Sequence, residues 1–457
     1  MTRIRAGFML AWVATAAVPV TSAMAGEGFL WGTATASFQA EGSPAPSDWL
    51  EWTHQPGRIT DRSNADVATD FWNRYEEDFS LAEQLGTNAF RMSLAWERIE
   101  PEPGVFDEAA LAHYEMMIAA MRAHHLEPVI TLWHSALPIW ISRRHGILAR
   151  GFDEEFARYA EKAVARLSAP PASVRYWMTL NEPATQAEGK YISGEDPSDY
   201  LGARGEIKSV SDDGLRFMRA MVAQVKAHLA AASRIRALRV PGLKVGVATD
   251  WTVLQTKDGN PLEKVIQSFS TRVYDRFFLD GIVFGKNNLC SGLGPLCPGF
   301  KLPGGKPAVD YIGVNYYTRQ VIAAKLFPPM IDIGNGPGPV SDRDMEIYAP
   351  GLELALKAVW EDYRIPPMVS ENGIADADDH QRPQFLADHL TYLRKAIVDD
   401  RIPVLGYLYW SLTDNFNWSG GLAQRLGLVE IDYATLERKP RPSFGTYRDL
   451  IHAFGVN

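Results

Sequence analysis

Two glutamates directly follow apolar, strand-like segments and could form a pair of catalytic carboxyl groups. Glu182 lies in WMTLNEP (177–183), and Glu371 lies in PMVSENG (367–373). Short apolar runs of this kind predict buried strands, which carry each carboxylate to the edge of a sheet. Cleavage of a glycosidic bond needs two facing carboxyl groups, one to protonate the leaving oxygen and one to act from the other face of the sugar. For either glutamate alone, capping of a strand or a helix is the ordinary alternative.

The rest of the chain alternates between short β-rich segments and amphipathic helical segments. Strands are predicted over 29–34, 88–94, 128–133, 174–181, 243–249, 309–315, 367–371 and 404–410. Helices are predicted over 68–85, 108–124, 154–167, 214–237, 263–284, 352–363, 384–398 and 444–453. Eight strands, each followed by a helix, predict an α/β protein with a single (β/α)8 TIM barrel.

Polar and aromatic residues recur at the carboxyl ends of these strands, where a barrel of this kind carries its active site. Besides the two glutamates, the residues at these ends are Gln39, Arg91, His134, Asn181, Asn315, Tyr317, Trp410, Asn417 and Trp418. The end of the fifth strand provides few polar or aromatic residues other than Asp250 and Trp251. Such a set supplies hydrogen-bond partners for hydroxyl groups and rings on which a sugar can stack. It contains no metal-ligand spacing, nucleophilic Ser or Cys elbow, or phosphate loop, so we expect neither metal nor cofactor.

The N-terminus has the three parts of a secretory signal. Arg3 and Arg5 precede an apolar stretch over 6–20, and an Ala-x-Ala site ends at Ala25. We expect a signal peptide over 1–25, a mature domain over 26–457 and a periplasmic or secreted location. The alternative is an uncleaved anchor, but the stretch falls short of the roughly 20 residues that span a bilayer, and Pro19 interrupts it.

The composition is that of a globular protein with a large core. Hydrophobic residues make up 46% of the chain and 13 residues are Trp, which suits a sugar-binding cleft as well as a core. The net charge of −9 disfavours a nucleic-acid partner. The two cysteines, Cys290 and Cys297, are expected to form a disulfide in an exported chain. The oligomeric state stays open.

Seven segments, in order and nearly from end to end of the chain, resemble the motifs of family 1 glycoside hydrolases, the β-glucosidase and β-galactosidase family. They are FLWGTATASFQAEG (29–42), FRMSLAWER (90–98), TLWH with LP (131–134 and 137–138), TLNEP (179–183), IGVNYY (312–317), SENG (370–373) and YWSLTDNFNW (409–418). The Asn-Glu-Pro motif alone would be weak evidence, whereas seven motifs at the predicted strand ends are specific.

The resemblance implies a retaining double displacement with Glu182 as acid/base and Glu371 as nucleophile. The two carboxyl groups should lie roughly 5–5.5 Å apart. Glu182 must begin protonated, and the charge of Glu371 favours this by raising its pKa. Arg91 and Tyr317 resemble the residues that contact the nucleophile, although an ion pair within the barrel would also explain Arg91.

The resemblance also implies contacts to the sugar in the −1 site. Asn181 should donate to its 2-hydroxyl, and Asn315 should orient the acid/base. Gln39 and His134 match the contacts to the 3- and 4-hydroxyls, with a core histidine as the alternative for His134. Trp410 and Trp418 would form the floor and wall.

Two positions depart from the family pattern. Ser135 stands where the family usually has Trp, and Asn417 stands where it usually has the Glu that binds the 4- and 6-hydroxyls. The sugar could therefore lack a 6-hydroxyl, carry an acceptor there or be further substituted. A 6-phospho-glycosidase is disfavoured, because Gln424 occupies the place of that group's Lys. Since Glu182 is not replaced by Gln, the family's thioglucosidases are not the match, and an O-glycosidase is expected.

The expected function is therefore an exported retaining β-glycosidase that hydrolyses a small or oligomeric β-glycoside. A transglycosylase that uses the same two glutamates is the alternative, because both share the first half-reaction. A non-catalytic carbohydrate-binding barrel is a third possibility, but it would not need Arg91, Tyr317 and both glutamates together.

Overall fold

The protein is described by a computed structural model that covers residues 28–197, 210–286, 300–325 and 331–454. The predicted signal peptide, Cys290 and Cys297 lie outside these residues, so the disulfide and the cleavage site stay predictions. No helix in the described ranges is long and apolar enough to cross a membrane.

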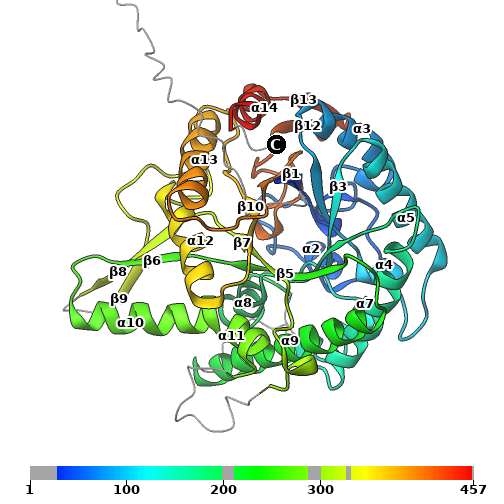
Figure 1. Ribbon diagram of the computed structural model, residues 1–457, viewed down its shortest axis with the longest axis horizontal. Helices are drawn as coiled ribbons and strands as arrows, with labels where there is room; N and C mark the ends of the chain where they lie inside the picture. Colours follow the sequence, from blue (N-terminus) through cyan, green and yellow to red (C-terminus); the bar gives the residue numbers. More distant parts are fainter. Residues whose placement is uncertain (1–27, 198–209, 287–299, 326–330, 455–457) are drawn as a thin grey trace, which may run out of the picture.

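Eight parallel strands close into a barrel, as predicted (Figure 1). In spatial order, each bonded to the next and the last to the first, they are β1 (Leu30–Ala34), β11 (Gly406–Trp410), β10 (Pro367–Asn372), β7 (Tyr311–Asn315), β5 (Lys244–Asp250), β4 (Tyr176–Asn181), β3 (Glu127–Trp133) and β2 (Ala89–Ser93). Each begins and ends within about two residues of its predicted bounds. The carboxyl ends of all eight therefore meet on one face, as parallel strands require.

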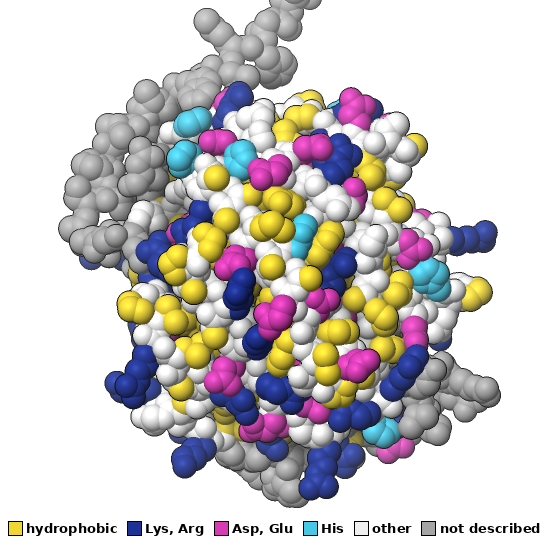
Figure 2. Space-filling view, turned by 90° about the vertical axis from the view of Figure 1, so that its right-hand side faces the viewer, with side chains coloured by type: hydrophobic (Ala, Val, Ile, Leu, Met, Phe, Trp, Pro, Cys, Tyr) yellow, Lys and Arg dark blue, Asp and Glu magenta, His cyan; other side chains and the backbone are white. Residues whose placement is uncertain are grey.

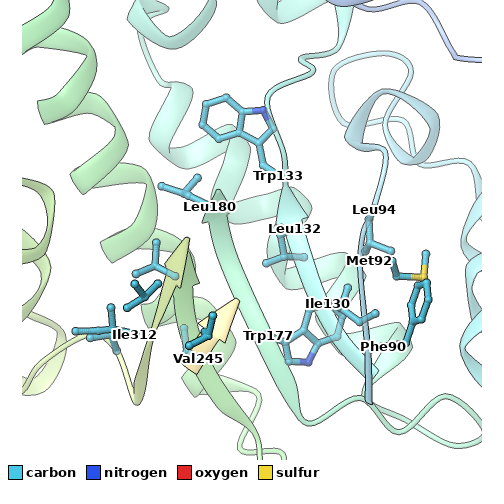
Figure 3. Close-up of a cluster of buried hydrophobic side chains, with 14 of the residues drawn as sticks. Phe90, Met92, Leu94, Ile130, Leu132, Trp133, Trp177, Leu180, Val245 and Ile312 are labelled. Carbon is cyan, nitrogen blue, oxygen red and sulfur yellow. The ribbon is translucent and has the colours of Figure 1, made fainter. Parts of the chain in front are cut away.

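Helices surround the barrel. The larger ones are α3 (Phe71–Gln84), α5 (Glu108–Ala123), α7 (Phe152–Leu167), α9 (Val210–Ala237), α12 (Pro350–Tyr363), α13 (Arg382–Val398) and α14 (Pro442–Phe454). Outward-facing strand residues such as Phe90, Met92, Ile130, Trp177 and Val245 pack beneath them (Figure 3). The helix predicted over 263–284 is instead α10 (Pro261–Thr271) and α11 (Phe277–Phe284), joined by a π-helical segment (η3, Arg272–Arg276).

The barrel interior is filled by side chains of the strands themselves. This inner cluster consists of Leu30, Ala89, Val129, Tyr176, Met178, Ala248, Tyr311, Met368 and Leu408. Apolar layers therefore occupy the lower part of the barrel, and the polar residues at the strand ends lie above them.

Two strands break their regular alternation just before the predicted catalytic residues. The register of β4 against β5 shifts between Met178 and Asn181, and that of β10 shifts after Val369 against both neighbours. A bulge of this kind changes the face on which the following side chains lie. The consecutive residues Ser370 and Glu371 consequently both bond partners inside the barrel mouth.

Two small sheets were not predicted. Strands β6 (Val253–Thr256), β8 (Arg319–Ala324) and β9 (Ile331–Gly334) form one sheet, which lies with α10 to one side of the barrel (Figure 1). Strands β12 (Val429–Asp432) and β13 (Glu437–Pro440) form a hairpin. On the face seen in Figure 2, acidic and basic side chains intermingle without a large basic patch.

Candidate active site

A cleft of about 280 Å³ opens at the carboxyl ends of the barrel strands. This volume is close to the lower end of the roughly 300–1,000 Å³ that small-molecule sites occupy. Of the predicted site residues, those that line it are Gln39, His134, Ser135, Asn181, Glu182, Tyr317, Glu371, Trp410, Asn417 and Trp418. Arg91 and Asn315 do not line the cleft; both are fully buried and bond the residues that do. The structure thus brings together the whole predicted set.

Glu371 is held by one donor on each carboxylate oxygen. Nη1 of Arg91 lies 2.6 Å from Oε1, and the hydroxyl of Tyr317 donates to Oε2 at 2.7 Å. The Arg91 side chain is itself fixed, because Nη2 donates to Oδ1 of Asn181 at 2.6 Å and Nε donates to Thr131. A fixed positive charge and a phenol donor both favour the carboxylate over the acid. Both carboxylate oxygens of Glu371 are therefore fixed in orientation by these two donors.

Glu182 has a different environment. It adopts a left-handed backbone conformation (φ 48°) at the N-cap of the short helix α8 (Pro183–Glu188), which is costly for a residue other than glycine. Nδ2 of Asn315 donates to Oε1 of Glu182 at 2.7 Å. Burial and the nearby charges of Glu371 and Asp250 raise its pKa well above the usual value. Glu182 is thus a neutral acid at a pH where an ordinary glutamate is ionised.

Asn181 and His134 are neighbours in the lining of the cleft. Nδ2 of Asn181 lies 3.2 Å from Nε2 of His134. The imidazole ring lies between Trp410 and Trp418, with ring centroids 5.7 and 5.9 Å away. Burial and the charge of Arg91 lower the pKa of His134 well below its usual value, so the ring is neutral.

Three buried polar atoms of cleft-lining residues have no partner within the described part of the chain. They are Oε1 of Gln39, Nδ1 of His134 and Oε1 of Gln186. Nε2 of Gln39 is held by the carbonyl of Phe416 at 2.9 Å, which fixes the amide in place. A buried polar group without a partner is costly, and a bound hydroxyl would satisfy it.

The side chain of Asn417 is neutral and is already hydrogen-bonded to another side chain. Its Nδ2 donates to Oε1 of Gln424 at 2.8 Å. Trp418 beside it stacks on Phe38, with ring centroids 6.2 Å apart and an interplanar angle of 6°. This corner of the cleft therefore offers amide groups and an aromatic wall in place of a charge.

The structure adds residues that the sequence reasoning had passed over. Asp250 lines the cleft, as do Thr185, Thr252 and Arg343. Burial, with a contribution from the charge of Glu371, raises the pKa of Asp250 to about 6. The signal for Asp250 was its position directly after the fifth predicted strand.

A closed (β/α)8 barrel with two buried carboxyl groups in one cleft at its strand ends has the architecture of a glycoside hydrolase. The sequence profile described as "Glycosyl hydrolase family 1" matches residues 22–456. The chain belongs to this family and is an O-glycoside hydrolase with a retaining mechanism, which confirms the resemblance seen in its motifs.

Relatives of known name support this assignment. Beta-glucosidase 6 of Oryza sativa subsp. japonica is 31% identical over 93% of this chain and 90% of its own length. A β-glucosidase of Agrobacterium sp. is 30% identical, with 93% and 95% of the two chains covered.

Solved structures agree with the fold. A rice β-glucosidase mutant in a covalent complex with Glc superimposes with a TM-score of 0.85 at 28% identity, covering 93% of this chain and 98% of that one. A family 1 β-glucosidase from Thermotoga maritima gives a TM-score of 0.84 at 27% identity, covering 94% and 99%.

Proposed function

We propose that the protein is an exported β-glycosidase in which Glu371 is the nucleophile and Glu182 is the acid/base. The observation that carries this proposal is the contrast between the two carboxyl groups. Glu371 has a cation and a phenol donor on its oxygens. Among the described residues, the carboxyl group of Glu182 has only an amide donor, and it has two neighbouring carboxylates. Different environments that separate the protonation of two carboxyl groups assign them different roles.

In the first half-reaction, a carboxylate oxygen of Glu371 attacks the anomeric carbon of the −1 sugar. The bond from that carbon to the leaving oxygen breaks, and the proton of Glu182 passes to the leaving oxygen. In the second half-reaction, Glu182 takes a proton from water, the water oxygen attacks the anomeric carbon, and the bond to Glu371 breaks. Both displacements invert the anomeric centre, so the β-configuration is retained overall.

The remaining predicted residues bind and orient the sugar in this proposal. Asn181 presents its amide next to Glu371, where it can donate to the 2-hydroxyl. Gln39 and His134 offer their unpartnered atoms to the 3- and 4-hydroxyls. Asn315 holds Glu182 in place, because its Nδ2 bonds the carboxyl group while Ser370 donates to its Oδ1 at 2.6 Å. Trp410 and Trp418 pack against the sugar ring.

We also propose that the sugar differs from glucose or galactose in its usual pose at the 4- and 6-positions. Asn417 and Gln424 bond each other and present only neutral groups, so a charge-assisted bond to these hydroxyls is lost. Ser135, which also lines the cleft, leaves space where the family usually has an indole ring. A sugar without a 6-hydroxyl, with an acceptor at this position or with a further substituent suits this corner.

Two measurements test this function. A panel of aryl β-glycosides (glucoside, galactoside, fucoside, mannoside, xyloside and glucuronide) identifies the sugar, and proton NMR of the best substrate follows the first anomer released. We expect the β-anomer first, followed by mutarotation. Release of the α-anomer first, or no turnover of any β-glycoside, would refute the proposal. Adding alcohol acceptors to the same reaction separates hydrolysis from transglycosylation by the products formed.

Export is tested separately. The basic, apolar and Ala-x-Ala parts of residues 1–25 support it, and the mature chain is expected to begin at Gly26. N-terminal sequencing of extracytoplasmic material checks this, and a chain that still begins at Met1 there would contradict it.

A further inference from the structure

Asp250 and Glu182 end two neighbouring strands of the barrel. β4 and β5 are paired with Asn181 opposite Ala248, and the backbone N–H of Glu182 donates to the carbonyl of Ala248 at 2.9 Å. Asp250, two residues later, ends β5, and both carboxyl groups line the same cleft. In the strand order β5 and β7 lie between β4 and β10, so Asp250 lies on the side of Glu182 that leads toward Glu371.

The positively charged Arg91 near these carboxyl groups is already ion-paired with another residue. Arg91 is ion-paired with Glu371 and also bonds Asn181. Within the described ranges, neither Glu182 nor Asp250 has a lysine, arginine or histidine within ion-pair distance. Two buried carboxyl groups that share a site without a counter-ion cannot both ionise readily, so the pair retains a proton to higher pH.

The hydrogen bonds of Asp250 indicate which member of the pair is ionised. The hydroxyl of Thr252 lies 3.4 Å from Oδ2, and the hydroxyl of Thr185 on α8 is a second donor. Hydroxyl donors favour a carboxylate, whereas the carboxyl group of Glu182 has a single amide donor in the described part of the chain.

We propose that Asp250 is a positioning residue that keeps the acid/base Glu182 protonated through its own negative charge. This inference rests on the proposed role of Glu182. Asp250 forms no bond to the reacting atoms in this account; it extends upward the pH range over which Glu182 can donate its proton.

Other charged groups around Asp250 do not change the sign of this effect. Glu371 on β10 adds negative charge. Asp275 on η3 accepts a hydrogen bond from the backbone of Thr252, but burial and the charge of Asp250 raise its pKa well above the usual value, so it favours the neutral form. Arg276 is paired with Asp362 at 2.7 Å, and Arg91 is paired with Glu371. Tyr317 donates its phenol proton to Glu371, and Glu188 and Arg343 line the cleft farther along.

The test is the pH profile of kcat/KM on the phenyl β-glycoside of the preferred sugar. Asp250→Asn removes the charge and keeps the shape of the side chain. For this variant, we expect the fall of kcat/KM on the basic side of the profile (the basic limb) to occur roughly one pH unit lower than in the wild type. The value of kcat/KM on the acid side of the optimum should change little. Asp250→Glu keeps the charge and should restore the wild-type limb.

Matched variants separate this role from a structural one. Asp388→Asn removes one negative charge from the exposed surface of α13, away from the cleft, and should leave the limb in place. If Asp250→Asn folds poorly, Asp250→Ser provides a second neutral side chain, and the same downward shift is expected.

The outcomes are distinct. If neutral variants keep the wild-type limb, or lose activity equally at all pH values, the role of Asp250 is wrong and the proposed function stands. If Glu182→Gln leaves the wild-type basic limb unchanged, the failure lies in the role of Glu182 itself.

Discussion

Arg91 and Glu371 form a buried ion pair at the barrel mouth, with Nη1 2.6 Å from Oε1. Arg91 links Glu371 to the strand end that carries Glu182, because it also bonds Asn181, which directly precedes Glu182. Substitution of Arg91 should therefore affect both stability and catalysis.

Arg91→Met should lower the free energy of unfolding by about 3–5 kcal/mol, because it leaves a buried carboxylate without its cation. Urea unfolding measures this loss. The control is Arg143→Met, which breaks an exposed pair with Glu51 and should cost at most about 1 kcal/mol. Equal small losses for both variants would show that the buried pair does not contribute as described.

Glu182→Gln should impair substrates with poor leaving groups far more than activated aryl glycosides. General acid catalysis is worth about 10²–10⁴-fold, and a good leaving group needs little of it. Comparing kcat/KM for alkyl and dinitrophenyl glycosides of one sugar checks this. An equal loss on both substrates would remove Glu182 from the role of acid.

The same variant should change how stability depends on pH. Because the pKa of Glu182 is raised in the folded state, its contribution to stability is full below the unfolded pKa of about 4.3 and declines as pH rises toward the folded pKa. Each pH unit in that window costs the wild type up to about 1.4 kcal/mol. Glu182→Gln should thus melt at a higher temperature than the wild type at neutral pH, and the difference should narrow at acid pH. A constant difference across pH would contradict the raised pKa.

Asn417→Glu should raise activity on β-glucosides or β-galactosides relative to the native substrate. A carboxylate at this position could form charge-assisted bonds to the sugar, each worth about 1.5–3 kcal/mol, so kcat/KM should rise roughly tenfold or more. Gln424 can turn its amide to donate to the new carboxylate, since its Oε1 now faces this position.

Gln424→Ala is the companion variant, because it removes the amide partner without adding a charge. It should not reproduce the gain on glucosides. A wild type that already prefers glucosides, together with an unchanged preference in Asn417→Glu, would mean that Asn417 does not determine specificity.

The barrel was predictable because buried parallel strands are apolar runs, and helices must separate them. The ring of site residues followed from the rule that barrel sites lie at the strand ends, so Gln39, His134 and Trp410 were placed with no distance known. The bulges were not predictable. Regular alternation cannot turn both Ser370 and Glu371 toward the barrel interior, and the register shift that does so depends on pairing with two other strands.

The relation of Asp250 to Glu182 is a second feature that could not be predicted from the sequence. A lone aspartate after a strand has many ordinary roles, and only the pairing of β4 with β5 shows that its neighbour is Glu182. The sheet of β6, β8 and β9 joins segments some 65 residues apart along the chain, a pairing that local patterns do not indicate.

The central claim is that Glu371 forms the covalent bond to the sugar, and rescue of Glu371→Gly by azide tests it most directly. Without added anion, the variant should lose turnover of the aryl β-glycoside, because no glycosyl-enzyme can form. Azide should partly restore turnover by attacking from the vacated side, and the product should be the α-glycosyl azide. Near-wild-type hydrolysis by Glu371→Gly without azide, or a β-configured azide product, would contradict the account.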